Sequence, residues 1–427
     1  MLSILPLLLL SGARPAERPD VVVFVIDDVA DSDIDAIPTP NLDRLAAEGV
    51  RFRRAYSHAW CAPTRDALMR STWLGDFHGD GCGPPGASTL DFGEFNLAKL
   101  FEGQGYHGVH LGKWHLGTNA IGPWEMTPHL MGFDHVRACF PIGDCDSVAR
   151  SWLRLDDGAT SNASGDITIA LRDAFAEWWD SLPGPRFAMV NFSAAHRPFI
   201  FPPRSILPPR YPRPLDPTNR EAFEAEVVGV DFVIGQLLPA LGPDTWIVFM
   251  GDNGTPGATP GMPLRESDAT RNDQDPTRVK LTCYEDGVRV PLIIRGPGVR
   301  RGTESQDLVH VVDLLPTFAE ILGTPLHAPV DGVSFAPVLS GGAGARNFVF
   351  VHSPPRRDNA IIQQRWKLLT NVKGVEELYD LQNDPRERHP LAPIGPVANR
   401  LRLLRSSILK EPPPFQSARG SSFVRDD

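Results

Sequence analysis

Two pairs of oxygen-bearing side chains each follow directly after a short apolar run. Asp27 and Asp28 form the first pair, and Asp252 and Asn253 form the second. Hard cations such as Ca²⁺ and Mg²⁺ prefer oxygen ligands of this kind. Three carboxylates at one place would repel one another, and a divalent cation would relieve that repulsion. A single pair usually caps a helix or lies in a solvated loop, but two pairs after buried strands favour a metal site.

Cys61 opens a pentapeptide, Cys-Ala-Pro-Thr-Arg, that ends at Arg65. A cysteine in a loop before a helix is most often a buried small hydrophobe or a disulfide partner. This pentapeptide, however, resembles the Cys-x-Pro-Ser/Thr-Arg signature of the formylglycine-dependent (type I) sulfatases, arylsulfatase-like enzymes of the alkaline-phosphatase-like superfamily. In that family the cysteine is oxidised to formylglycine, whose hydrated aldehyde is the nucleophile. One hydroxyl attacks sulfur and the other expels sulfate, whereas a serine or thiol would need external water to release the product.

Four further segments match signatures of the same family, in the family's order. They are residues 105–117, which end in Gly-Lys-Trp-His-Leu-Gly, and residues 251–254, 280–291 and 378–387. Together with the pentapeptide they cover most of the chain, from about residue 20 to residue 391. Each motif alone is weak to moderate, but the ordered set is highly specific.

The resemblance implies a calcium site, with magnesium the less favoured metal. The ligands would be Asp27, Asp28, Asp252, Asn253 and an oxygen of the modified Cys61. A cation bound there would orient the hydrated aldehyde and lower its pKa.

The resemblance also implies roles for the basic residues of the motifs. Arg65 would steady the hydrate, and Lys113 and Lys280 would bind sulfate oxygens and stabilise charge as the S–O bond breaks. His196 would protonate the leaving alcohol or help to bind sulfate, and His115 would assist the release of sulfate. Taken without their motifs, His115 and Lys113 also fit a packed core histidine and a solvated lysine.

The chain departs from the family pattern at four places, among them Asp286, where glycine is usual, and His389, where asparagine is common. Residues 68–71 read Leu-Met-Arg-Ser where Leu-x-Thr-Gly is usual, and His196 is followed by Arg-Pro where Pro-His-x-Pro is commoner. The region of residues 68–71 helps the modifying enzyme to recognise the nascent chain, so a non-catalytic protein that binds sulfated glycans stays an alternative. A phosphonate or phosphate ester hydrolase of the same superfamily is the other alternative.

The elements that must position these residues alternate between strands and helices. Strands are expected at residues 20–26, 108–111, 187–192, 245–250 and 288–294, and helices at residues 39–49, 167–182, 220–241 and 308–322. This alternation predicts a mostly parallel sheet covered on both faces. Ligands bind beyond the carboxyl ends of such strands, where the acids, lysines and histidines occur. The expected fold is an α/β, alkaline-phosphatase-like three-layer sandwich with a small C-terminal α+β subdomain.

Three segments are expected along the chain. Residues 1–19 read as a signal peptide, residues 20–345 as the sulfatase catalytic domain, and residues 346–427 as the C-terminal subdomain and tail. The subdomain should contain an antiparallel sheet from residues 348–351, 360–369 and 377–381, and a helix at residues 397–409.

Composition limits the function and the cellular compartment. The net charge of −10 argues against nucleic-acid binding, and the apolar run at residues 1–10 is too short to span a bilayer. We therefore expect no integral membrane association and export to a periplasmic, secreted or lysosome-like compartment. The expected partners are a sulfated small molecule or polysaccharide and, during maturation, the formylglycine-generating enzyme.

Five cysteines are an odd number for an exported protein. If Cys61 is modified, Cys82, Cys139, Cys145 and Cys283 remain for two disulfides of undetermined pairing. The short spacing of Cys139 and Cys145 makes one loop-closing pair the first guess.

Overall fold

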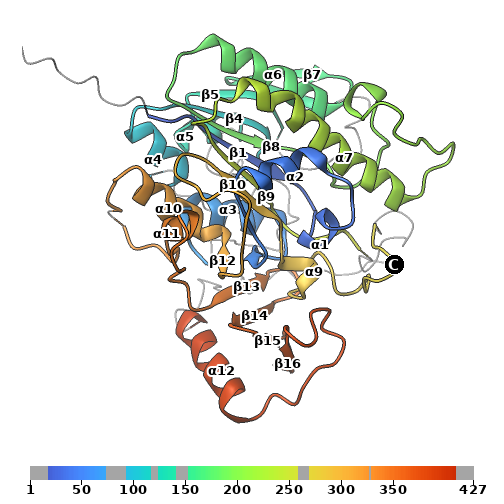
Figure 1. The fold of residues 1–427 in the computed structure, drawn as a ribbon, viewed down its shortest axis with the longest axis vertical. Coiled ribbons are helices and arrows are strands. Elements are labelled where there is room, and N and C mark those ends of the chain that lie inside the picture. Colours follow the sequence, from blue (N-terminus) through green and yellow to red (C-terminus); the bar gives the residue numbers. More distant parts are fainter. Residues whose placement is uncertain are drawn as a thin grey trace, which may run out of the picture.

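The structure is a computed structural model that describes residues 18–73, 93–116, 124–140, 152–257, 269–326 and 328–409. In this part of the chain a ten-stranded sheet has the order β11-β2-β10-β9-β1-β8-β4-β5-β6-β7. Figure 1 shows helices packed over this sheet and a smaller sheet below it. The predicted α/β sandwich with a second, antiparallel sheet is confirmed.

The centre of the large sheet is parallel. Its strands are β9 (Trp246–Gly251), β1 (Val21–Ile26), β8 (Arg186–Asn191), β4 (His107–Lys113) and β5 (His135–Phe140). The sequence of β1, Val-Val-Val-Phe-Val-Ile, is completely buried, as expected for a parallel strand covered on both faces.

The edges of the sheet are mixed. On one side β10 (Leu292–Arg295) runs antiparallel to β9 and to β2 (Val50–Phe52), and β11 (Thr303–Ser305) is parallel to β2. On the other side β6 (Trp152–Asp156) is antiparallel to β5 and to β7 (Ala159–Ala163). Within these ten strands β10 and β6 alone oppose the common direction.

Alternate residues of β1 face two different cores. Val22, Phe24 and Ile26 pack with α2 (Pro40–Ala47), α6 (Ile167–Ser181) and α7 (Asn219–Leu237). Val21, Val23 and Val25 belong to the other core, which also holds residues of α3 (Cys61–Arg70), α4 (Leu97–Gly103) and α10 (Leu314–Ile321). This alternation produces the three layers.

Short elements connect these layers. They are α1 (Asp31–Ile34), β3 (Ala55–Tyr56), η1 (Trp124–Met126), α5 (Thr127–Leu130), η3 (Arg204–Ile206), η4 (Leu238–Ala240), α9 (Glu285–Val288), β12 (Val309–His310), η5 (Val311–Asp313) and α11 (Ala336–Leu339). No helix in the described ranges is long and apolar enough to cross a membrane.

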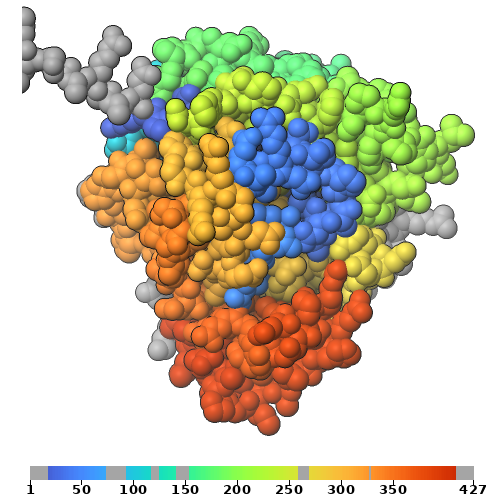
Figure 2. Space-filling view, in the orientation of Figure 1, coloured from blue at the N-terminus to red at the C-terminus, as the bar shows by residue number. Residues whose placement is uncertain are grey.

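The C-terminal sheet is an antiparallel meander. Its strands are β13 (Val349–Ser353), β14 (Asp358–Gln363), β15 (Trp366–Thr370) and β16 (Glu376–Asp380), and α12 (Gly395–Leu409) packs on β14 and β15. Figure 2 shows these red and orange segments seated directly beneath the rest of the molecule.

Several predicted elements differ in detail. Residues 360–369 are not one strand but a hairpin that turns at Gln364, whose φ is +53°. Residues 288–294 begin in α9, so the strand starts only at Leu292. The helix expected at residues 308–322 is shorter, because η5 comes first and α10 begins only at Leu314, with Pro316 in its first turn.

Cys139 and Cys283 are buried and form no disulfide within the described residues. The expected pairing of Cys139 with Cys145 stays a prediction. Cys82 and Cys145 lie outside the described residues, as do residues 1–17 of the predicted signal peptide and residues 410–427 of the tail. The division of the chain at residue 345 stays a prediction.

Candidate active site

The two predicted acid pairs lie side by side at the carboxyl edge of the sheet. β1 and β9 are parallel neighbours whose last residues are level, so the residues that follow them meet. The backbone N–H of Asp28 donates to Asp252 Oδ1 at 3.1 Å, and Asn253 Nδ2 donates to Asp28 Oδ1 at 2.7 Å. These three residues and Asp27 are almost completely buried. The structure therefore brings together the four acid and amide residues among the five that were predicted to bind a metal.

Cys61 is the first residue of α3, and its side chain is fully buried. Its Sγ lies 3.5 Å from Asp27 Oδ1 and 3.8 Å from Asp28 Oδ1. Pro63 fits the first turn because the N–H groups there have no intrahelical acceptor. Burial and, secondly, the Asp27 carboxylate raise the pKa of the Cys61 thiol well above its ordinary value.

Arg65 follows Cys61 by about one helical turn and so lies on the same face of α3. Its Nη2 donates to Asp252 Oδ2 at 2.9 Å, and its Nη1 donates to Asn191 Oδ1 at 2.8 Å and to the Lys113 carbonyl at 3.0 Å. Asn191, the last residue of β8, was missed by the sequence analysis. Its signal was present, since β8 is a parallel neighbour of β1 and ends in a buried amide.

A bulge at the end of β4 sets the direction of Lys113. The pairing of β4 with β5 shifts register between Leu111 and Lys113, where Gly112 has φ +86°. A Cβ at Gly112 would lie 1.9 Å from the Asn191 carbonyl oxygen, so only glycine fits. The Lys113 ammonium then reaches Asp27, with which it forms a fully buried ion pair.

Lys280 reaches the same acids from another segment. Its backbone N–H donates to the Thr255 carbonyl at 2.9 Å, which ties the segment to the loop after β9. Its Nζ forms an ion pair with Asp28 and lies 3.4 Å from Cys61 Sγ. Although burial opposes its charge, the Asp28 carboxylate raises the pKa of Lys280 above its ordinary value, and Asp27 does the same for Lys113.

His115 and His196 both adjoin the acids and lysines. The His196 Nδ1 lies 2.7 Å from the Arg197 carbonyl oxygen, and a carbonyl only accepts, so this nitrogen carries a hydrogen. The other nitrogen, Nε2, lies 3.9 Å from Asp28 Oδ2. Burial lowers the pKa of both rings well below the ordinary value, helped most by Lys280 for His196 and by Lys113 for His115.

The donor set fits a hard divalent cation. Asp27, Asp28, Cys61 and His196 each offer a ligand atom, and these atoms lie within 4.8 Å of one another. The Cys61 sulfur in this set stands where an oxygen of formylglycine would be after modification. Asn253 Oδ1 is buried and, among the described residues, has no hydrogen-bond partner, which an incoming cation would supply. His196 joins this set although the sequence analysis assigned it no metal role.

The segment that departs from the family pattern is well accommodated. Arg70 donates twice to Asp66 at 2.7 Å and once to Glu94 at 3.0 Å. Ser71 ends α3 in the left-handed conformation, with φ +59°, where the family's glycine would be unstrained. Its hydroxyl donates to the Val312 carbonyl at 2.6 Å. The motif difference therefore leaves the helix that carries Cys61 intact.

Three histidines pack beneath the segment that leads into Cys61. The ring of His58 lies 4.2 Å from that of His352 and 4.9 Å from that of His310, which in turn contacts Trp73. His58 and His310 are fully buried. Burial lowers the pKa of all three rings, that of His352 to about 4. They connect the segment that leads into Cys61, β12 and the C-terminal sheet as neutral groups.

Acid should therefore destabilise the protein through this cluster. The unfolded chain has histidine pKa values of about 6.5, so below that pH it binds protons that the folded cluster excludes. The contribution of the cluster to the free energy of unfolding is therefore complete above about pH 6.5, and it decreases as the pH falls toward 4. Urea denaturation at several pH values should show this decrease, and His352→Gln should make it shallower. An equally steep decrease of the free energy of unfolding with falling pH in His352→Gln would contradict the assignment of this acid sensitivity to the cluster.

The model of one known protein family matches most of the chain. The family described as Sulfatase matches residues 19–324, which include every residue of the site. The chain belongs to the sulfatase family. A second family model, described as "N-sulphoglucosamine sulphohydrolase, C-terminal", matches residues 279–402, which include the C-terminal sheet of this sulfatase.

Curated relatives agree with this membership. The sulfatase is 28% identical to arylsulfatase A of Bos taurus, over 82% of this chain and 73% of the relative. It is 22% identical to an N-acetylgalactosamine-6-O-sulfatase of Bacteroides thetaiotaomicron, over 91% of this chain and 92% of the relative. Enzymes with these names are sulfuric ester hydrolases, and the predicted enzyme class is confirmed.

Solved structures share the fold. Ps i-CgsB superposes with a TM-score of 0.75 at 24% identity and covers 92% of both chains. A phosphonate monoester hydrolase of Agrobacterium radiobacter superposes with a TM-score of 0.68 at 20% identity, over 92% of this chain and 95% of the other. At such identities the likeness concerns the fold alone, so the choice between sulfate and phosphonate chemistry depends on the site.

Proposed function

We propose that this sulfatase hydrolyses sulfate monoesters of aryl or carbohydrate alcohols, using a formylglycine made from Cys61 and a bound Ca²⁺. The main support is the position of Cys61, which lies at a helix N-terminus between the buried Asp27, Asp28 and Lys280. A helix N-terminus favours the negative charge that a sulfate ester brings. The formylglycine would supply a nucleophile that releases its sulfate without external water.

The metal would bind to oxygen ligands that the fold already groups. Asp27, Asp28, Asp252 and Asn253 Oδ1 are the donors we assign, and carboxylate and amide oxygens of this kind are the ligands that calcium prefers. The bound cation would lower the pKa of the nucleophile. Arg65 would hold Asp252 in place through its 2.9 Å hydrogen bond.

The charges of the site explain how the lysines would become available to substrate. Three buried carboxylates, of Asp27, Asp28 and Asp252, face three cations, of Arg65, Lys113 and Lys280. A divalent cation among the carboxylates would compete with both lysine ammonium groups. Lys113 and Lys280 would then be an excess of positive charge that binds sulfate oxygens and stabilises the charge of the breaking S–O bond.

The two histidines would handle protons. An anionic substrate beside His196 would raise the pKa of its ring, because a nearby negative charge favours the imidazolium. His196 Nε2 would then protonate the leaving alcohol. His115 would take the proton from the nucleophile during sulfate release, a role that needs the neutral ring, which burial favours by lowering the pKa of His115.

The substrate class follows from the relatives rather than from the site. The named relatives comprise an arylsulfatase and an N-acetylgalactosamine-6-O-sulfatase, so aryl sulfates and sulfated sugars are both proposed as substrates. We also propose export and maturation by the formylglycine-generating enzyme, on the sequence grounds given above. A non-catalytic protein is disfavoured because the charged groups of the site are retained together with an undistorted α3.

An aryl sulfate should be turned over at least about 100-fold faster than the matching aryl phosphonate monoester. The phosphonate has the same leaving group and the same single negative charge, but phosphorus replaces sulfur and a phenyl group replaces one oxygen, so the ratio reports on the site itself. The measurement is kcat/KM for 4-nitrophenyl sulfate and for 4-nitrophenyl phenylphosphonate with one enzyme preparation.

A ratio that favours the phosphonate would move the protein to the alternative hydrolase class. Absence of both activities in fully modified protein would favour the glycan-binding alternative.

A further inference from the structure

A pocket of about 360 Å³ lies outside the candidate active site, where the catalytic sheet meets the C-terminal sheet. Four arginines from separate turns line it: Arg53 and Arg54 between β2 and β3, Arg289 after α9, and Arg365 between β14 and β15. The volume is in the range of ligand pockets in other proteins. Such a concentration of guanidinium groups contrasts with the chain's net charge of −10.

Two of these guanidinium groups lack a close carboxylate. Arg54 makes no ion pair within the part of the chain that the structure describes, and it donates to the backbone carbonyl of Gln364. Arg289 is partly buried, and its carboxylate contacts are long, 3.5 Å to Glu285 and 3.9 Å to Asp31. Both groups therefore keep donor capacity for an anion.

The acids that line the pocket are already engaged by other cations. Asp31 pairs with Arg51 at 2.8 Å, outside the pocket lining. Glu285 pairs with the buried Lys367 at 3.0 Å. Their negative charge is thus largely compensated. Arg53 and Arg365 are paired with Asp35 at 2.6 Å and with Asp380 at 3.0 Å, so Arg54 and Arg289 supply the excess positive charge of the cavity.

Amide and hydroxyl groups complete the lining. Gln306 and Gln382 are exposed at the rim, and Tyr56 lies at the inner wall, where its hydroxyl donates to Glu285 at 3.2 Å. The Arg365 guanidinium carbon lies over the Trp366 ring, 4.7 Å from its centroid. Guanidinium forks match the oxygens of sulfate and carboxylate, and amides suit sugar hydroxyls.

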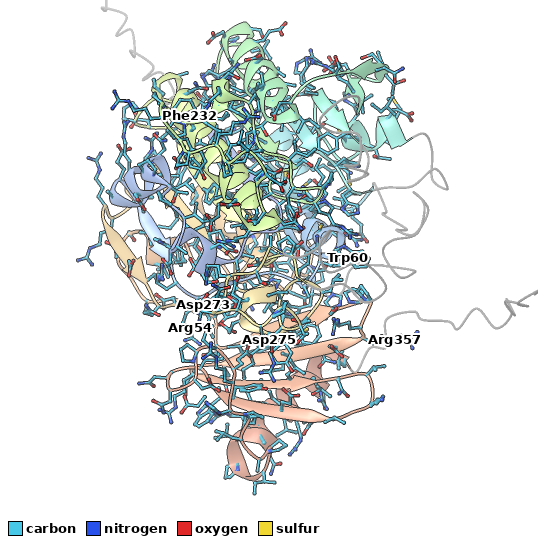
Figure 3. The ribbon with its side chains drawn as sticks, turned by 90° about the vertical axis from the view of Figure 1, so that its right-hand side faces the viewer. Arg54, Trp60, Phe232, Asp273, Asp275 and Arg357 are labelled. Carbon is cyan, nitrogen blue, oxygen red and sulfur yellow. The ribbon has the colours of Figure 1, made fainter. Side chains whose placement is uncertain are left out.

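We propose that this pocket is a second oxyanion site, which binds a sulfate-type anion carried by a saccharide or free in solution. The assignment is independent of the chemistry at Cys61. Figure 3 shows Arg54 toward the left of the ribbon and Trp60, the neighbour of Cys61, toward the right, so the two sites lie apart. A polyanionic substrate would gain a second point of attachment, and the free anion would link the two sheets.

Binding to the full-length, calcium-loaded protein tests the proposal. Equilibrium dialysis with radiolabelled inorganic sulfate should find a second bound sulfate per chain in the wild type and lose it in Arg54→Ala/Arg365→Ala. Arg54→Lys keeps the charge but not the fork, and should weaken binding at the second site at least about tenfold. The control Arg400→Ala removes an exposed arginine on α12 and should keep both sulfates.

The source of the anion follows from a second probe. If galactose 6-sulfate binds the second site at least about tenfold more tightly than inorganic sulfate, the natural ligand is a sulfated sugar. If the two affinities are equal, the ligand is the free anion. Hydrolysis of 4-nitrophenyl sulfate, which spans only the active site, should be unchanged in Arg54→Ala/Arg365→Ala. The proposal would be overturned if the wild type bound only one sulfate per chain. It would also be overturned if the double variant, with an unaltered melting temperature, bound the second sulfate as the wild type does.

Discussion

Replacing Cys61 by serine should reduce multiple turnover of aryl sulfate by about 10⁴-fold or more. Serine is nearly isosteric, so the ion pairs of Lys113 and Lys280 with the acids should persist. Its hydroxyl can attack sulfur, but the sulfate ester it forms has no second hydroxyl on the same carbon to expel the product. We therefore expect at most one turnover, followed by a chain that carries one SO₃ group.

Mass spectrometry of the tryptic peptide AYSHAWCAPTR checks the mechanism directly, since this peptide spans residues 55–65. In the wild type it should contain an aldehyde or its hydrate at Cys61, and in Cys61→Ser a sulfated serine. Cys283→Ser is the matched control, because Cys283 is also a buried free thiol but contacts the Val351 and Asp358 carbonyls instead of the acids. Full activity with an unmodified thiol at Cys61 would refute the formylglycine proposal.

The position of the site was predictable because parallel strands end at one edge of a sheet. Residues at the carboxyl ends of β1, β4 and β9 are distant in sequence, yet the alternation of strands and helices already predicted that Asp27, Lys113 and Asp252 would meet. The ordered motifs supplied the roles. Asn191 was missed because no motif contains it, although it too ends a central strand and holds Arg65.

Elements without a periodic apolar pattern were not predictable. β7, Ala-Thr-Ser-Asn-Ala, is an exposed edge strand with no apolar face, so its formation depends on pairing with β6. The hairpin at Gln364 lacks the glycine or proline that usually marks a turn. The arginine pocket was also not predictable from the sequence, because its residues come from isolated turns that only the packing of the two sheets brings together.

Removal of calcium should abolish turnover, and loss of one carboxylate should weaken calcium binding strongly. In Asp252→Asn the ligand set keeps its size but loses one of three negative charges. We expect the dissociation constant for Ca²⁺ to rise about 100-fold, or about 2.7 kcal/mol. Dialysis against a chelator, followed by titration calorimetry with Ca²⁺ and Mg²⁺ and by assays of aryl sulfate turnover, provides the measurement.

Asp231→Asn is the matched control for this effect. Asp231 is equally buried, on α7, but it accepts hydrogen bonds from Asn41 and Leu42 far from the site. Its replacement should lower the free energy of unfolding without changing calcium affinity. In Asp252→Asn the Arg65 guanidinium loses its 2.9 Å carboxylate partner, so a drop in stability is expected there as well. Calcium affinity, and not stability, therefore separates a metal ligand from a structural acid, and undiminished turnover after verified removal of divalent metal would exclude the proposed calcium mechanism.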